Sequence, residues 1–82
     1  MTINEFLRQL TELLDIDDEL TSDSNLKQYD EFDSMAIMSL VAFIHKNFGK
    51  QFSARQLNQI ETVNSLIELI GKDNFIEWIY SL

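Results

Sequence analysis

The N-terminal part of the chain has the apolar spacing of an amphipathic helix. Its apolar face is formed by Ile3, Phe6, Leu7, Leu10, Leu13 and Leu14. Intervals of three and four residues between apolar positions are typical of one helix face. Thr2 followed by Glu5 fits a capping box. The pattern therefore predicts a helix over residues 3–15 whose apolar face packs against the rest of the chain.

A second helix is predicted to begin at Asp33 or Ser34 and to end at Asn47 or Phe48. Gly49 follows it and suits the left-handed conformation in which helices commonly end. At about 100° per residue, one face is apolar and is expected to point to the core: Ile37, Leu40, Val41, Ile44 and Phe48. This second helix is therefore expected to be a central packing element.

Met35, Met38 and Ala42 form a second apolar stripe on the same helix, close in angle to Ser34. A stripe of this kind has two interpretations. It is either peripheral packing around the core or a docking strip for a partner protein. The sequence leaves both open.

Two shorter helices are predicted after Gly49. Ser53 is a suitable N-cap for a helix from Ala54 to about Gln59, and Thr62 is one for a helix over Val63–Ile70. The residues expected to point inward are Phe52, Leu57, Val63, Leu66, Ile67 and Ile70. The segment Asp73–Leu82 is rich in apolar residues and includes Trp78, so a terminal helix packed on the bundle is expected there.

An acidic connection joins the first two predicted helices over residues 15–33. Its expected anchors in the core are Leu20, Leu26, Tyr29 and Phe32. Connections of this length are uncommon in small domains, and they tend to be functional or to contain a short helical turn. The connection is therefore expected to do more than span two helices.

A calcium-binding loop is one possibility for this connection, because Asp15, Asp17 and Glu19 alternate along it. The spacing argues against it. The sixth position is Leu20 where a glycine makes the sharp turn, and the twelfth is Leu26 where a bidentate glutamate belongs. A solvated acidic loop is favoured, and no metal ligands are predicted.

Composition places the chain in the all-α class. Its 82 residues suffice for one domain, proline and cysteine are absent, and no strand pattern competes with the helical one. No stretch reaches the eighteen or so apolar residues of a membrane span, and the N-terminus lacks the layout of a signal peptide. A cytoplasmic protein without a membrane span is expected.

Negative charge is concentrated in the first part of the chain. Residues 1–33 hold ten acidic and two basic residues, and residues 34–82 hold four of each, so the whole net charge of −8 lies before Ser34. A field of this sign repels nucleic acid and steers basic protein surfaces. A protein partner is therefore expected, and no nucleic acid.

Ser34 is the one side chain in a chemically suggestive position. A nucleophilic serine needs a base within hydrogen-bond reach, but the single histidine, His45, lies eleven positions along the same helix, about 16 Å away. No catalytic residues are therefore predicted, and the chain is not expected to be an enzyme. Ser34 could instead be the substrate of a modifying enzyme, or Ser34 or Asp33 could serve merely as the helix N-cap.

Residues 3–71 resemble the acyl carrier protein family, which includes peptidyl and D-alanyl carrier domains. The family signature at the start of the second helix is Asp-Ser-Leu or Asp-Ser-Met, and Asp33, Ser34 and Met35 match it. The match continues without gaps through Leu40, Val41, Phe48, Gly49, Phe52, Ile60, Thr62, Val63, Ile70 and Gly71. The resemblance implies a four-helix carrier bundle, here one domain over residues 1–82 with a long first loop and an added helical segment over 72–82.

The resemblance also implies a cofactor. In the family, this serine is esterified to 4'-phosphopantetheine by a phosphopantetheinyl transferase that uses coenzyme A, so Ser34 would be the attachment site and Asp33 its neighbour in the motif. The terminal thiol of the arm would carry the cargo as a thioester, which accounts for the absence of cysteine. Further implied partners are an acyl- or aminoacyl-loading ligase and downstream synthase or transferase enzymes, with the carrier itself a monomer.

The chain departs from fatty-acid-type carriers around this motif. Those carriers usually have a glycine and a small residue where Glu31 and Phe32 stand. Their second helix has carboxylates at the positions of Ala36, Ser39, His45 and Lys46. Because those carboxylates dock on basic enzyme patches, we expect partners to contact Met35, Met38 and Ala42 by apolar packing, with the acidic loop supplying long-range steering.

In family members that enclose a long acyl chain, the cavity lies near the positions of Ile44, Phe52, Ile60 and Leu66. Leu66 stands where a small residue is common, so a short or polar cargo is expected. A discrete carrier for a specialised pathway is the favoured function. The alternatives are a carrier in primary fatty acid synthesis and a helical protein-interaction adaptor that kept the carrier fold.

Overall fold

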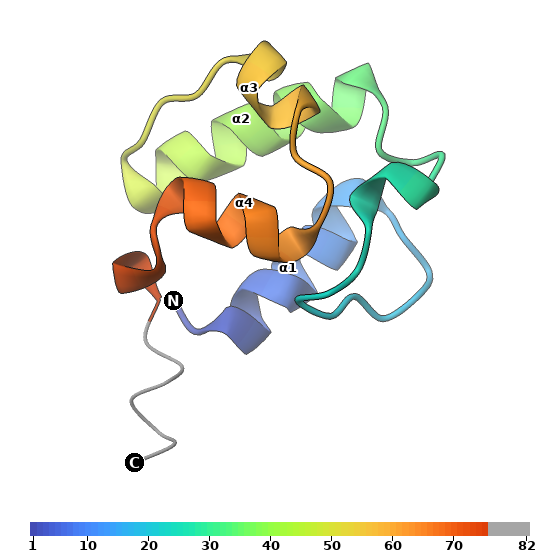
Figure 1. The fold of residues 1–82 in the computed structure, drawn as a ribbon, viewed down its shortest axis with the longest axis horizontal. Coiled ribbons are helices and arrows are strands. Elements are labelled where there is room, and N and C mark those ends of the chain that lie inside the picture. Colours follow the sequence, from blue (N-terminus) through green and yellow to red (C-terminus); the bar gives the residue numbers. More distant parts are fainter. Residues whose placement is uncertain (76–82) are drawn as a thin grey trace.

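The structure is a computed structural model and describes residues 1–75. These residues contain four α-helices and two single 3₁₀ turns (Figure 1). In chain order they are α1 (Ile3–Leu14), η1 (Leu26–Gln28), α2 (Ser34–Phe48), α3 (Ala54–Asn58), α4 (Val63–Ile70) and η2 (Lys72–Asn74). No strand is present within these residues, which confirms the all-α fold class. No helix among them is long and apolar enough to cross a membrane.

Side-chain caps begin each of the four α-helices, as the sequence predicts. Thr2 and Thr62 accept hydrogen bonds from the backbone N–H groups of Glu5 and Ser65. Among the helices of residues 1–75, a reciprocal capping box forms only at Ser53 and Gln56. At Thr2 the structure shows only the bond from the Glu5 N–H, at 3.1 Å. The capping box predicted for Thr2 and Glu5 is thus reduced to a simple N-cap.

The core forms where the apolar faces of the helices meet. Its fully buried side chains are Phe6, Leu10, Leu26, Leu40, Ile44, Leu57, Val63, Leu66, Ile67, Ile70 and Phe75. An aromatic cluster closes one end of it: the ring of Phe6 lies 5.2 Å from Phe75 and 6.1 Å from Phe48, measured between centroids. Pairs in this arrangement add about 0.5–1.5 kcal/mol beyond burial. The start of α1 is thereby joined to η2 at the same end of the bundle (Figure 1).

The long connection between α1 and α2 is attached to the turn between α3 and α4. The N–H of Leu26 donates to the carbonyl of Glu61 at 2.7 Å, and the N–H of Val63 donates to the carbonyl of Ser24 at 3.0 Å. Buried Ile16, Leu20 and Leu26 pin the connection to the core. The expected short helical turn is present as η1. Burial of Leu20 and Leu26 was predicted, whereas that of Ile16 was not.

The C-terminal segment differs from the prediction at its start. Instead of a helix beginning at Asp73, the chain makes the single 3₁₀ turn η2, and Phe75 is extended with φ −118° and ψ 150°. Gly71, at φ 109°, redirects the chain after α4. Residues 76–82, including Trp78 and the rest of the predicted terminal helix, lie outside the described residues.

Candidate functional site

Asp33 and Ser34 have different roles at the N-terminal end of α2. Asp33 has extended backbone geometry and is the N-cap, since its Oδ1 accepts a hydrogen bond from the Ala36 N–H at 2.9 Å. Ser34 is the first residue of the helix and is exposed. Of the two N-cap candidates, Asp33 is therefore the one that caps the helix in the structure. The hydroxyl of Ser34 is not needed to begin the helix.

The same helix end favours a negatively charged group next to Ser34. The first N–H groups of a helix have no carbonyl partner within it, and the Asp33 carboxylate satisfies only that of Ala36. The N–H groups of Ser34 and Met35 thus remain without an intrahelical partner, at the positive end of the helix dipole. Phosphate groups bind well in such surroundings. The helix end would thus favour a phosphate ester on Ser34, whereas the adjacent Asp33 carboxylate would oppose it.

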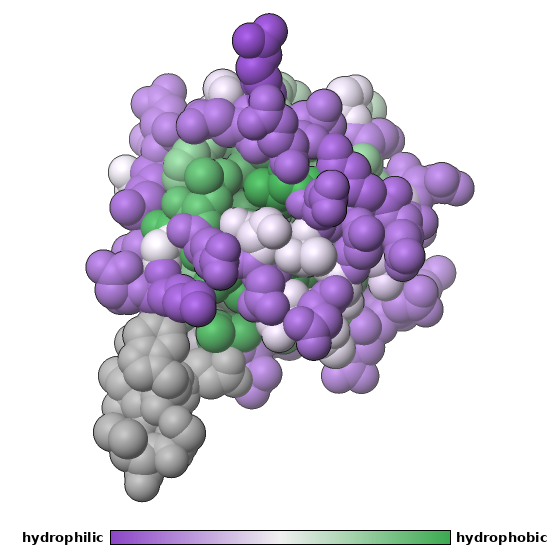
Figure 2. Space-filling model, in the orientation of Figure 1, coloured by the Kyte–Doolittle hydropathy of each residue, from purple (hydrophilic) through white to green (hydrophobic). Residues whose placement is uncertain are grey.

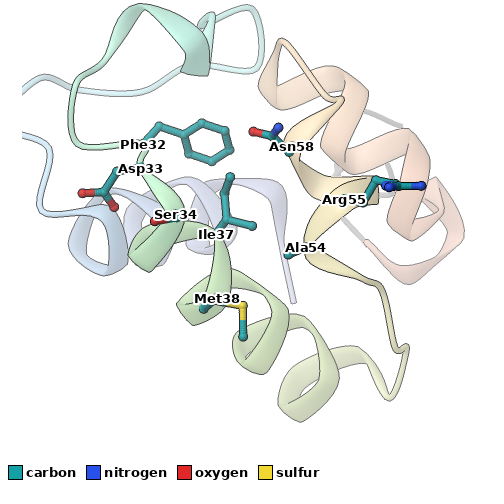
Figure 3. Close-up of a pocket in the computed structure, with 8 residues that line it drawn as sticks. All are labelled: Phe32, Asp33, Ser34, Ile37, Met38, Ala54, Arg55 and Asn58. Carbon is teal, nitrogen blue, oxygen red and sulfur yellow. The ribbon is translucent and has the colours of Figure 1, made fainter.

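An open cavity of about 380 Å³ adjoins Ser34 where α3 packs on the first turns of α2. Its lining mixes apolar and polar side chains: Phe32, Asp33, Ser34, Ile37, Met38, Ala54, Arg55 and Asn58. Figure 3 shows the ring of Phe32 and the amide of Asn58 directed toward one another across the cavity, whereas the guanidinium of Arg55 points away from Ser34. Ser34 therefore opens onto a mixed surface built from α2, α3 and the end of the connection before α2.

The second apolar stripe of α2 is exposed. Met35 has 79% of its surface in solvent and Met38 has 60%, and they are the exposed large hydrophobic side chains of residues 1–75. Ala42, one turn further along, is also exposed. The two methionines therefore lie at the surface and not at the edge of the core. Figure 2 shows one face of the molecule, on which hydrophilic side chains surround an area of hydrophobic ones.

Comparison with known proteins assigns the chain to a family. A family model described as "Phosphopantetheine attachment site" matches residues 4–70. The chain belongs to the acyl carrier protein family. An acyl carrier protein of Coprothermobacter proteolyticus is 33% identical over 54 residues, and this alignment spans 66% of the chain and 66% of the length of that relative. No solved structure gave a significant match.

Membership in this family makes 4'-phosphopantetheine the expected cofactor, and the residues at the head of α2 fit it. An attachment serine must be reachable by another enzyme, and Ser34 is exposed. The linkage is a phosphate ester, and the N-terminus of α2 favours a phosphate. Bound there, the group would supply the thiol that a chain without cysteine lacks.

The cargo-pocket residues predicted for this carrier domain lie in and around the core. Ile44 and Leu66 are fully buried, Ile60 is 8% exposed, and Phe52 is partly buried against the same cluster. None of the four lines the cavity beside Ser34. The role of these residues toward a cargo stays a prediction.

For four of the residues that line the cavity, nothing in the sequence indicated this position. Phe32 was noted as a departure from related carriers and as a core anchor, but not as a cavity wall. Ala54, Arg55 and Asn58 belong to the short helix α3, and only its packing against α2 brings them near Ser34. Their place follows from tertiary structure, so no local pattern could have found them.

Proposed function

We propose that this chain is a carrier protein that holds biosynthetic intermediates as thioesters on a 4'-phosphopantetheine arm attached to Ser34. One observation carries the proposal: the exposed Ser34 hydroxyl is released from capping by Asp33, within a segment that matches the family model. The chain itself contributes position and accessibility. The reactions of the cargo belong to the arm and to visiting enzymes.

The proposed partners follow from this role. A phosphopantetheinyl transferase would attach the arm from coenzyme A, an acyl- or aminoacyl-loading ligase would charge it, and synthase or transferase enzymes would consume the cargo. The carrier would act as a cytoplasmic monomer. The matched family and the similarity to an acyl carrier protein support the general role.

A specialised pathway is favoured over primary fatty acid synthesis by the charge of α2. The helix contains no acidic residue, and its last turn holds His45 and Lys46. A basic enzyme patch therefore finds no carboxylates on this helix to pair with. We assign docking instead to Met35, Met38 and Ala42, with the acidic connection of residues 15–33 steering the partner from a distance.

A charge placed on the methionine stripe tests the docking assignment. Met38→Glu and Met35→Glu would each bury a carboxylate against an apolar partner surface, so productive transfer to the cognate partner should fall at least about tenfold, for a loss of about 1.4 kcal/mol or more. Asn47→Glu adds the same charge to α2 away from the stripe and serves as the control. Normal transfer with both methionine variants would refute the docking assignment.

A short or polar cargo is favoured by the full burial of Ile44 and Leu66. Interiors are packed densely, so a long chain would have to displace these side chains. Loading the carrier with short and long acyl groups and comparing methyl NMR shifts of Ile44 and Leu66 tests this. Small shifts with both cargoes are expected, and a long chain shielded between these residues would contradict the proposal.

Intact-mass measurement after incubation with coenzyme A and a promiscuous transferase tests the function itself. The wild-type chain should gain the mass of one phosphopantetheine group and Ser34→Ala should gain none. Ser39→Ala removes another exposed hydroxyl of α2 and should be modified like wild type. Failure of every transferase to modify the wild-type chain would favour the alternative, an adaptor that kept the carrier fold.

A further inference from the structure

The cavity beside Ser34 has an apolar wall. The ring of Phe32 lines the cavity together with Ile37. Phe32 is only partly buried, so part of its surface is not used in the core. The cavity therefore presents an apolar wall directly adjacent to the proposed attachment site.

The opposite side of the cavity is polar and is held in place. Asn58 ends α3, and its backbone carbonyl accepts a hydrogen bond from the Lys27 ammonium group of η1. Its side-chain amide is directed into the cavity toward Phe32 (Figure 3). An amide at this place can both donate and accept hydrogen bonds.

The pantetheine arm has matching chemistry along its length. Next to its phosphate it has a carbon with two methyl groups, and beyond that it has two secondary amides. Methyl groups are favoured against Phe32 and Ile37 because apolar contact removes their surface from water. Amides can exchange hydrogen bonds with Asn58. A volume of about 380 Å³ is also within the usual size of small-molecule sites, about 300–1,000 Å³.

We propose that this cavity is an intramolecular binding site for the pantetheine arm, here called the seat. In it, Phe32 contacts the geminal methyl groups and Asn58 binds the amides. The proposal rests on attachment of the arm to Ser34. Because the arm and the seat belong to one molecule, weak contacts suffice to populate the seated state. The guanidinium of Arg55 points away from Ser34, so no contact with the arm is assigned to it.

NMR spectroscopy of the isotopically labelled holo protein, with an unlabelled arm, tests the seat. The apo and holo proteins are first compared by intact mass, which reports attachment separately from seating. In the holo protein we expect nuclear Overhauser effects from the geminal methyl groups to the Phe32 ring and the Ile37 methyls, and backbone amide shifts across Ala54–Asn58. A holo protein with shifts confined to the neighbours of Ser34 and no such effects would overturn the seat while leaving the carrier function intact.

Two variants with matched controls complete the test. Phe32→Ala should lose the methyl contacts, whereas Phe43→Ala, which removes another partly buried ring, should keep them. Because Phe32 also packs against the core, the exposed Asn58→Ala is the variant least able to disturb the fold. It should lose the amide shifts of α3, with Gln59→Ala as its control. Unchanged arm contacts in Asn58→Ala would overturn the role of Asn58, and a wild-type chain that is never modified would overturn seat and carrier together.

Discussion

At the scale of single residues, the site depends on which of two adjacent side chains begins α2. Asp33 caps the helix through the Ala36 N–H, and this leaves the Ser34 hydroxyl exposed and uncommitted. A serine that both capped a helix and carried a modification would lose its cap when modified. The arrangement avoids that conflict, because the cap and the hydroxyl proposed for modification belong to different residues.

This division predicts stability effects of different size at the two neighbouring positions. Asp33→Ala removes the cap and should cost about 1 kcal/mol, whereas Ser34→Ala removes a hydroxyl at the surface and should change stability by less than about 0.5 kcal/mol. Urea denaturation of the unmodified variants measures both. Asp33→Asn keeps a capping oxygen and should remain near wild type. A loss in Ser34→Ala as large as that in Asp33→Ala would contradict the assignment of the cap.

Gly49 gives a second prediction for a single residue. It ends α2 with φ +68°, a conformation that costs residues with a Cβ about 1–2 kcal/mol. A Cβ added there would meet nothing within 4 Å, so Gly49→Ala should cost about 1 kcal/mol through backbone conformation alone. Gly49→Asn should cost less, because asparagine tolerates this region better. Equal costs in urea denaturation would contradict the conformational explanation.

At the scale of elements, the connection between α1 and α2 behaves as part of the fold. It meets the turn before α4 in a short antiparallel bridge between Asn25 and Thr62, flanked by backbone hydrogen bonds. The same region carries Lys27, which bonds to the end of α3. The connection thereby links α3 to the chain leading into α2, and both of these form the cavity at Ser34.

Hydrogen exchange should reveal this bridge. The amides of Leu26, Val63 and Asn64 donate to carbonyls across it and should exchange far more slowly than those of the exposed residues 17–19. Because all of these amides belong to one protein, their exchange rates are compared under the same pH and temperature. If Leu26 exchanged as fast as residues 17–19, the connection would be a loosely attached loop instead of a structural element.

The elements that the sequence predicted are those with a local signature. Helices α1, α2 and α4 follow from apolar periodicity, and their ends follow from capping residues and Gly49. The bridge between Asn25 and Thr62 could not be predicted, because backbone hydrogen bonds between distant segments leave no side-chain pattern. The terminal segment was misjudged at its start, since apolar content alone did not separate the 3₁₀ turn and buried Phe75 from a helix.

The candidate site likewise has a part that the sequence predicted and a part that it did not. Asp33 and Ser34 were identified from a motif of three consecutive residues, which is visible in any single sequence. The cavity wall contributed by α3, including Asn58, depends on how α3 packs against α2. Local pattern therefore located the proposed attachment site, whereas only the assembled bundle shows what surrounds it.

At the scale of the whole molecule, charge is separated along the chain. The net charge of −8 arises before Ser34, whereas α2 contains no acidic residue. A partner approaching the head of α2 therefore meets an acidic connection on one side and a neutral to basic helix on the other. We propose that such a distribution orients a partner with a basic surface before contact and raises its association rate.

Salt dependence tests this steering. The association rate with a cognate enzyme should fall as ionic strength rises, because salt screens charges beyond a Debye length of about 8–10 Å near physiological strength. Replacing exposed Asp17, Asp18 and Glu19 by their amides should lower the association rate and weaken its salt dependence, with little change in dissociation. A rate independent of salt would exclude the acidic connection as a steering surface.

The most direct test of the account is to locate the modification along the chain. After incubation with coenzyme A and a phosphopantetheinyl transferase, the protein is digested and its peptides are sequenced by tandem mass spectrometry. The account predicts one phosphopantetheine group, carried by Ser34 and by no other serine, including the exposed Ser39 on the same helix. A chain that stays unmodified, or one modified at a different residue, would contradict it.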